Sequence, residues 1–113
     1  MNIHIYIQSL KQAIAQLAAP YSIQIESVPE YVEAASDFAS EFDAVKHLAS
    51  QLYKGGYVSK RLLVLVFRID SLLDSIQNDP SDLWTNEALR DAEKWEVVRR
   101  FARDALTELQ KKL

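Results

Sequence analysis

The chain has 113 residues, 49% hydrophobic and 26% charged, a balance typical of soluble globular proteins and too apolar for a disordered one. This length allows one hydrophobic core, so we expect residues 1–113 to form a single helical domain. The absence of cysteine excludes disulfides, a thiolate nucleophile and cysteine-ligated metals. The net charge of −3, with all of the acidic excess in residues 1–59, argues against nucleic acid as a partner.

The hydrophobic residues are not arranged for a membrane. The longest uninterrupted apolar run is Leu62–Phe67, far shorter than the roughly 20 residues that a membrane-spanning helix requires. No secretory signal is recognisable at the start of the chain. We therefore expect a cytoplasmic protein that has no membrane partner.

The first predicted helix covers residues 3–19. Short strands at residues 2–8 and 21–26 are the alternative, because both segments also alternate apolar and polar residues. We favour the helix because its apolar pattern is unbroken and because two strands alone would form a marginal sheet. After Pro20, residues 21–26 are then an extended connection. The apolar residues of this helix recur at alternating spacings of four and three: Ile3, Ile7, Leu10, Ile14 and Leu17.

A second helix is predicted from Ser27 to the glycine pair Gly55-Gly56. Ser27 and Glu30 have the spacing of a capping box, in which each side chain accepts a hydrogen bond from the other residue's backbone amide. The glycines supply the left-handed conformation that ends many helices. Small residues on the apolar face, such as Ala35, allow a neighbouring helix to approach closely.

Residues 57–76 are the most apolar segment and predict a central helix around which the others pack. The helical pattern continues for about three turns beyond the run Leu62–Phe67, which favours a helix over a short buried strand. A helix this apolar needs neighbours on several sides. Its apolar stripe consists of Val58, Leu62, Leu65, Val66, Ile69, Leu72, Leu73 and Ile76.

The last helix has two possible starts, Asp79-Pro80 and Thr85. Its cluster of Arg99, Arg100 and Arg103 is expected to form ion pairs with acidic neighbours on an exposed face. Together the segments predict an all-α bundle of four main helices. The apolar stripe of the last helix consists of Ala88, Ala92, Trp95, Val98, Ala102, Ala105 and Leu109.

Glu30, Glu33, Asp37 and Glu41 are candidate partner-binding residues, because their spacing places them on one face of the second helix. A solvated acidic face is the simplest interpretation, and a docking surface for a basic partner is the functional one. Carboxylates also bind Mg²⁺ or Ca²⁺. No second carboxylate-bearing helix with suitable spacing is recognisable, so we expect no metal site.

Val64 and Phe67 interrupt the polar side of the central helix, which is otherwise marked by Lys60, Arg68 and Ser71. An aliphatic and an aromatic residue at these positions indicate a contact surface for a partner or for a second copy of the chain. The alternative is that the N-terminal segment covers them.

His47 is the one candidate phosphoacceptor. It lies on the polar side of the second helix, four residues after Asp43, where the two side chains can meet. A histidine on a helix, followed by a glycine turn and two more helices, resembles a histidine phosphotransfer domain. That resemblance implies phosphorylation of His47. Ser50 and Gln51 stand where that family has lysine and glycine, and an ordinary surface histidine is the alternative.

Residues 61–72 and 97–101 resemble the last two helices of BAG domains, which are three-helix modules that bind the nucleotide-binding domain of Hsp70. The resemblance covers the second half of the chain. It implies a chaperone partner contacted by Asp70, with Lys94 in place of the family's arginine. Lys60 stands where that family has an acidic residue.

No catalytic constellation, nucleotide-binding loop or cofactor motif is recognisable in the sequence. We therefore expect a non-enzymatic protein-interaction module that acts as an adaptor, an inhibitor or a subunit of an assembly. Its partner would be another protein or a second copy of the chain, and it would use no cofactor and no small-molecule substrate.

Overall fold

Helices account for almost all of the regular structure. The computed structural model describes residues 2–30 and 32–111, and this part of the chain contains no strand. The all-α prediction is therefore confirmed, and the strands considered at 2–8 and 21–26 are not formed. The helices are α1 (Ile3–Ala18), α2 (Tyr21–Glu26), α3 (Ala34–Val45), α4 (His47–Lys54), α5 (Lys60–Gln77), α6 (Asn86–Asp91) and α7 (Glu93–Gln110).

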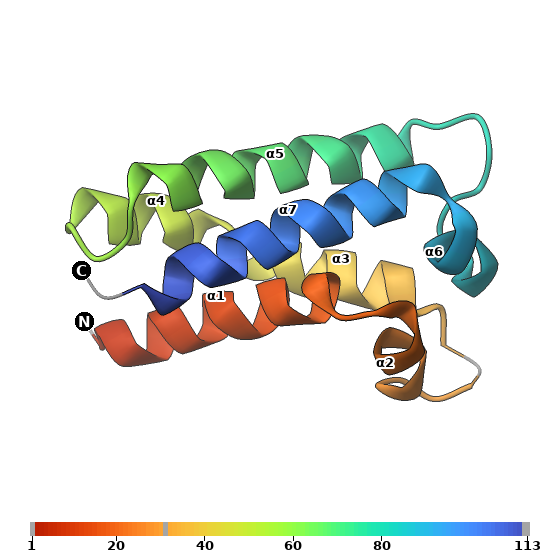
Figure 1. The fold of residues 1–113 in the computed structure, drawn as a ribbon, viewed down its shortest axis with the longest axis horizontal. Coiled ribbons are helices and arrows are strands. Elements are labelled where there is room, and N and C mark those ends of the chain that lie inside the picture. Colours follow the sequence, from red (N-terminus) through yellow and green to blue (C-terminus); the bar gives the residue numbers. More distant parts are fainter. Residues whose placement is uncertain (1, 31, 112–113) are drawn as a thin grey trace.

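Four long helical segments form an antiparallel bundle that runs up, down, up and down (Figure 1). Only Lys46 separates α3 from α4, so these two helices act as one broken segment. Around the bundle, α1 packs against α3 and α4, α4 against α5, α5 against α7, and α7 against α1. The start of α1 and the end of α7 lie at one end, and the short helices α2 and α6 lie at the other (Figure 1).

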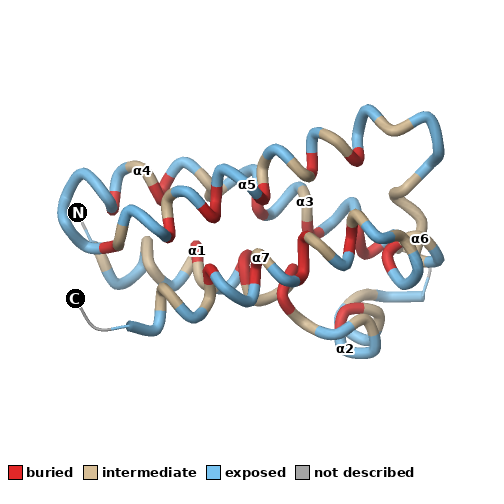
Figure 2. The backbone as a smooth tube through the Cα atoms, turned by 45° about the horizontal axis from the view of Figure 1, so that its top comes forward, coloured by how far each residue is buried: buried red, intermediate tan, exposed pale blue. Residues whose placement is uncertain are grey.

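The core lies where the long helices face one another, and buried positions recur along their inner sides (Figure 2). Trp95 of α7 is fully buried, and its indole nitrogen donates to the carbonyl oxygen of Leu83 at 2.7 Å. Trp84 meets it edge to face, with 5.8 Å between the ring centroids. Each large apolar side chain buried in this way contributes about 1.5–3 kcal/mol to folding.

The apolar stripe predicted for the central helix is confirmed from Leu62 to Ile76, where every member is buried except Leu72, which is half-buried. Val58 is buried as well, but the helix begins three residues later than the predicted start at 57, at Lys60, because Ser59 is its N-cap and accepts from the amide of Leu62. The neighbours of α5 are α4 on one side and α7 on the other. Within the residues that the structure describes, no helix combines the length and the apolar character needed to cross a lipid bilayer.

The chain between α1 and α3 differs from the prediction. Residues 21–26 form a short helix rather than an extended connection, and this helix buries Gln24. The capping box is absent: the Ser27 hydroxyl donates to the carbonyl oxygen of Gln24 at 2.7 Å and so closes α2. The next helix begins only at Ala34, with Glu33 as its N-cap.

The end of α4 follows the prediction. Gly56 has a positive φ of 79°, and its amide donates to the Tyr53 carbonyl at 3.0 Å. The amide of Tyr57 donates to the Leu52 carbonyl at 2.9 Å. These two bonds form a Schellman motif, which satisfies carbonyl groups that the helix leaves free at its C-terminus.

The start of the last helical segment is at Thr85, whose hydroxyl accepts from the amide of Ala88 at 3.0 Å. The start considered at Asp79-Pro80 is wrong, because these residues belong to the loop after α5. The segment is also interrupted at Ala92, which has an extended conformation. This break lets α6 cover the end of the bundle while α7 runs along its length (Figure 1).

Candidate functional site

The outer side of α5 carries a continuous exposed stripe. Val64 and Phe67 are 38% and 56% exposed, although both are large and hydrophobic. The helical segment α1, which was considered as a cover, packs against α3, α4 and α7 instead. Residues at successive spacings of four and three share one side of a helix, here the side opposite the buried stripe. The exposed members, which we call the α5 stripe, are Lys60, Val64, Phe67, Ser71 and Asp74.

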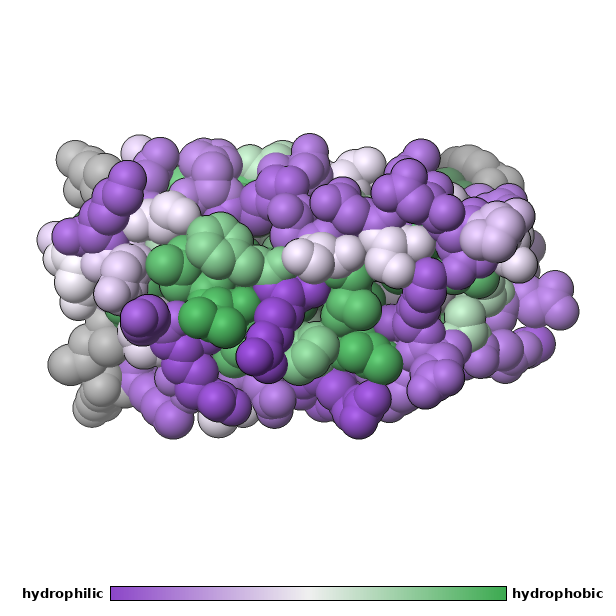
Figure 3. Space-filling view, turned by 90° about the horizontal axis from the view of Figure 1, so that it is seen from above, coloured by the Kyte–Doolittle hydropathy of each residue, from purple (hydrophilic) through white to green (hydrophobic). Residues whose placement is uncertain are grey.

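A groove of about 360 Å³ lies beside the α5 stripe, between α5 and α7. The Arg68 guanidinium lies over the ring of Phe101 in α7, 5.7 Å from its centroid. Seen from above α5, hydrophobic side chains gather in one area that hydrophilic side chains border and cross (Figure 3). The groove is lined by Lys60, Arg61, Val64, Leu65, Arg68, Phe101 and Asp104.

The predicted acidic face on the second helix is only partly formed. Glu30 lies outside any helix, so the prediction of a single face from Glu30 to Glu41 is wrong. The carboxylate of Glu33 accepts a hydrogen bond from the backbone amide of Asn86 at 2.9 Å, which ties it to α6. Asp37 and Glu41 lie on α3 and are exposed. The four carboxylates therefore do not act as one group.

Lys46 occupies the break between α3 and α4 and joins both to α5. Its ammonium lies 2.7 Å from a carboxylate oxygen of Asp43 and 2.7 Å from one of Asp70. These two carboxylates raise the pKa of Lys46, the bond to Asp43 having the larger effect. Two of the residues predicted to act at a functional site, Asp43 and Asp70, are thus held by a structural ion pair.

His47 is exposed at the first position of α4. Asp43, which was expected to contact it, forms its ion pair with Lys46. In the BAG comparison, Lys94 is engaged as well, because its ammonium lies 2.7 Å from a carboxylate oxygen of Asp79. His47, the residue behind the phosphotransfer resemblance, therefore lacks the expected contact with Asp43. Asp70 and Lys94, the residues behind the BAG resemblance, form ion pairs within the chain.

A second cavity, of about 370 Å³, lies between α3 and α5 and is lined by Ser36, Ser40, Asp43, Asp70, Asp74 and Trp84 among others. Lys46 forms ion pairs with two of the three carboxylates that line this cavity, those of Asp43 and Asp70. Across residues 2–30 and 32–111, no group of three or more histidine, aspartate or glutamate side chains is placed to hold a metal ion.

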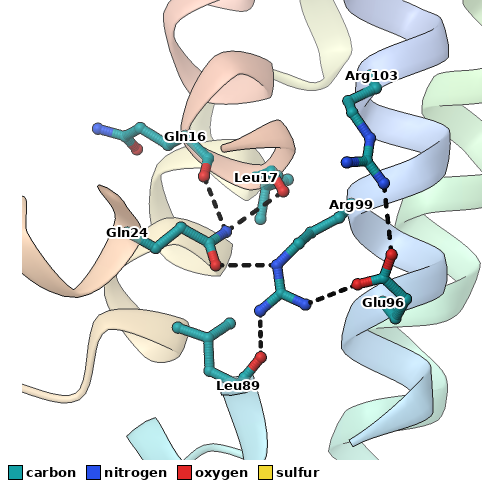
Figure 4. Close-up of polar contacts among 7 residues, drawn as sticks. All are labelled: Gln16, Leu17, Gln24, Leu89, Glu96, Arg99 and Arg103. Atoms are coloured by element: carbon teal, nitrogen blue, oxygen red, sulfur yellow. Dashed lines mark hydrogen bonds and ion pairs between the residues drawn. The ribbon is translucent and has the colours of Figure 1, made fainter. Parts of the chain in front are cut away.

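Sequence reasoning missed one buried polar network. Arg99 is 4% exposed, and its guanidinium donates to the Gln24 side-chain oxygen at 3.1 Å and to the Leu89 carbonyl (Figure 4). The Gln24 amide in turn donates to the carbonyls of Gln16 and Leu17 at 3.0 and 3.3 Å. The expectation of an exposed Arg99 is therefore wrong.

This network joins the C-terminal end of α1 to α2, α6 and α7 (Figure 4). Its signal in the sequence is the register of Arg99, which follows Val98 and precedes Ala102 on the buried side of α7. The ion pairs predicted for the cluster of Arg99, Arg100 and Arg103 are partly formed. Glu96 contacts Arg99 at 3.3 Å and Arg103 at 3.4 Å. The network fixes helix positions and offers no open site.

Comparisons with known protein families, with curated proteins and with solved structures found no match for this chain.

Proposed function

We propose that the chain is a protein-interaction module that binds its partner through the α5 stripe, as an adaptor, an inhibitor or a subunit of an assembly. The observation that supports this proposal is the exposure of Val64 and Phe67, at 38% and 56%, on the helix whose opposite side forms much of the core. A large aromatic side chain beside an aliphatic one is the usual centre of a protein interface.

The surroundings of the stripe support the same proposal. Lys60 and Arg68 flank the apolar pair, and the groove toward α7 offers a recess for side chains of a partner. Apolar anchors with a charged rim are the common anatomy of a binding surface. Burial of an anchor such as Phe67 contributes on the order of 2 kcal/mol, which corresponds to about a 30-fold change in affinity.

Two acidic residues on α3, Asp37 and Glu41, lie away from the α5 stripe and add an electrostatic attraction for a partner. Among the described residues, the side chains of Asp37 and Glu41 form no ion pair or hydrogen bond. Their charges are free to speed the approach of a basic partner, an effect that salt screens. Glu33, which caps α6, contributes less to such attraction because its carboxylate is already bound.

The test compares two substitutions at equally exposed positions. Phe67→Glu places a charge on the α5 stripe, and Ile5→Glu places one on α1, where Ile5 is 58% exposed. Both variants should keep the helical circular dichroism of the parent, because neither side chain is buried. Pull-down from extract of the native cell should lose its specific partner with Phe67→Glu and retain it with Ile5→Glu. Equal retention by both variants would reject the α5 stripe as the binding surface.

A further inference from the structure

We propose that the occupant of the α5 stripe is a second copy of this chain, packed antiparallel with Phe67 at the two-fold axis. This inference rests on the proposed function, since it assigns the partner of the same surface. The α5 stripe suits its own copy because its two ends carry opposite charges, Lys60 at the N-terminal end and Asp74 toward the C-terminal end.

The spacing places these charges symmetrically. Lys60 precedes Phe67 by seven residues and Asp74 follows it by seven, which is about 10.5 Å along the helix in each direction. In an antiparallel pair centred on Phe67, residues at equal distances from the centre on opposite sides meet. Phe67 then packs on Phe67 of the second copy. Val64, three residues before the centre, lies nearest to Ser71 of the second copy, four residues after it, because these are the adjacent members of the facing α5 stripes.

The same symmetry pairs Lys60 with Asp74 of the second copy, and it does so twice. Such an interface is isologous, because one surface meets an identical surface and closes the assembly at two copies. A parallel arrangement would instead set Lys60 against Lys60 and Asp74 against Asp74, and repulsion between like charges disfavours it.

The two charges are available to a partner. Among the residues that the structure describes, neither Lys60 nor Asp74 forms an ion pair. Arg61, the next cation along α5, has its Nε 3.7 Å from a carboxylate oxygen of Glu108, and the Arg68 guanidinium lies over the ring of Phe101, so both are held toward α7, beside the α5 stripe. The stripe therefore offers one apolar centre and one available charge of each sign.

A charge exchange tests the arrangement. Lys60→Glu and Asp74→Lys each turn two attractive contacts into two repulsive ones, so each should raise the dissociation constant of the dimer by about tenfold or more. The double variant restores opposite charges at both contacts and should return the constant to within about twofold of the parent. Both substitutions suit the helix dipole, with an acid near the N-terminus and a base near the C-terminus, so folding is preserved.

The measurement is mass by sedimentation equilibrium over a wide range of protein concentration, with circular dichroism as the check on folding. A monomeric parent chain, or a double variant that stays as weak as the single ones, overturns the antiparallel dimer. If the parent is monomeric and Phe67→Glu still loses a captured partner, the proposed function stands and only the second copy is rejected.

A cysteine trap gives an independent readout, because the chain has no cysteine of its own. Phe67→Cys puts one thiol beside its symmetry mate, and mild oxidation should yield a covalent dimer. Ile5→Cys, at a similarly exposed position on α1, serves as the control and should remain monomeric on the same timescale. Equal rates of crosslinking for the two variants would overturn the proposal.

Discussion

The side chains of Glu33 and Asn86 each accept a hydrogen bond from the first backbone amide of the other residue's helix, Glu33 at the start of α6 and Asn86 at the start of α3. The Glu33 carboxylate accepts from the Asn86 backbone amide at 2.9 Å, and the Asn86 side-chain oxygen accepts from the amide of Ala34 at 3.0 Å. The Asn86 side-chain nitrogen also donates to the Val32 carbonyl at 3.3 Å. Two helix starts that are far apart in sequence therefore depend on one another, and α6 is anchored against α3.

Replacing Asn86 by alanine should lower the free energy of unfolding by about 1–2 kcal/mol, because the first amide of α3 loses its acceptor. Urea denaturation followed by circular dichroism measures the change. A double-mutant cycle with Glu33→Ala should show that the two effects are not additive, since each side chain positions the other. Strictly additive effects would mean that the two caps act separately.

Gln24→Leu should destabilise the protein by about 2–4 kcal/mol, although the two side chains have similar volumes, because it leaves buried groups without partners. The groups that lose a partner are the Arg99 Nε–H, whose guanidinium keeps its bonds to Leu89 and Glu96, and the carbonyls of Gln16 and Leu17. The control is Gln8→Leu on the exposed side of α1, which should change stability by less than about 0.5 kcal/mol. Thermal and urea unfolding of both variants provide the comparison.

The pH dependence of stability should include a contribution from Glu108. Hydrogen bonds from Lys111 and from the Ser59 hydroxyl hold the pKa of Glu108 below its usual value. A lowered pKa stabilises the folded protein above the unfolded-state pKa of about 4.3, and the contribution is lost as pH falls through the folded-state pKa. Glu108→Gln should therefore be less stable than the parent at pH 7, with the difference shrinking as the solution is acidified. A difference that stays constant with pH would contradict this assignment.

Gly56→Ala should cost about 1–2 kcal/mol, because Gly56 has a φ of 79° that residues with a side chain adopt only with strain. Gly55→Ala is the matched comparison, since Gly55 has a negative φ. A methyl group at Gly55 would come within 2.7 Å of the Tyr57 ring, which is 44% exposed and able to move. Denaturation midpoints should rank the parent first, Gly55→Ala second and Gly56→Ala last.

The features that could be predicted correctly from the sequence are those determined by residues close together in the chain. The spacing of apolar residues located α1 to within one residue at its end and identified the buried side of α5. The turn at Gly56 depends only on its own backbone conformation. For such elements, periodicity and turn chemistry carry the information directly.

The features that the sequence did not reveal depend on residues far apart in the chain. Ser27 and Glu30 have the spacing of a capping box, yet Asn86 supplies the acceptor at the start of α3. Acidic neighbours along the helix place Arg99 on an ion-paired surface in the prediction, whereas its buried partner Gln24 lies 75 residues earlier. The register of Arg99 on α7 indicates its burial, but no local pattern identifies Gln24 or Asn86 as the partner, because each contact exists only once the bundle has formed.

The packing of α1 against α7 has a consequence for synthesis on the ribosome. The apolar side of α1, with Leu10, Ile14 and Leu17, meets α7 only when the last helix has emerged. About 75 residues separate the two helices, which at roughly 5–20 residues per second is a delay of about 4–15 seconds. Until then the nascent chain shows this side of α1 either to α3 and α4 alone or to the surrounding solution. Because α7 is synthesised after the other helices, we expect the native bundle to form only once α7 is available to cover this side of α1.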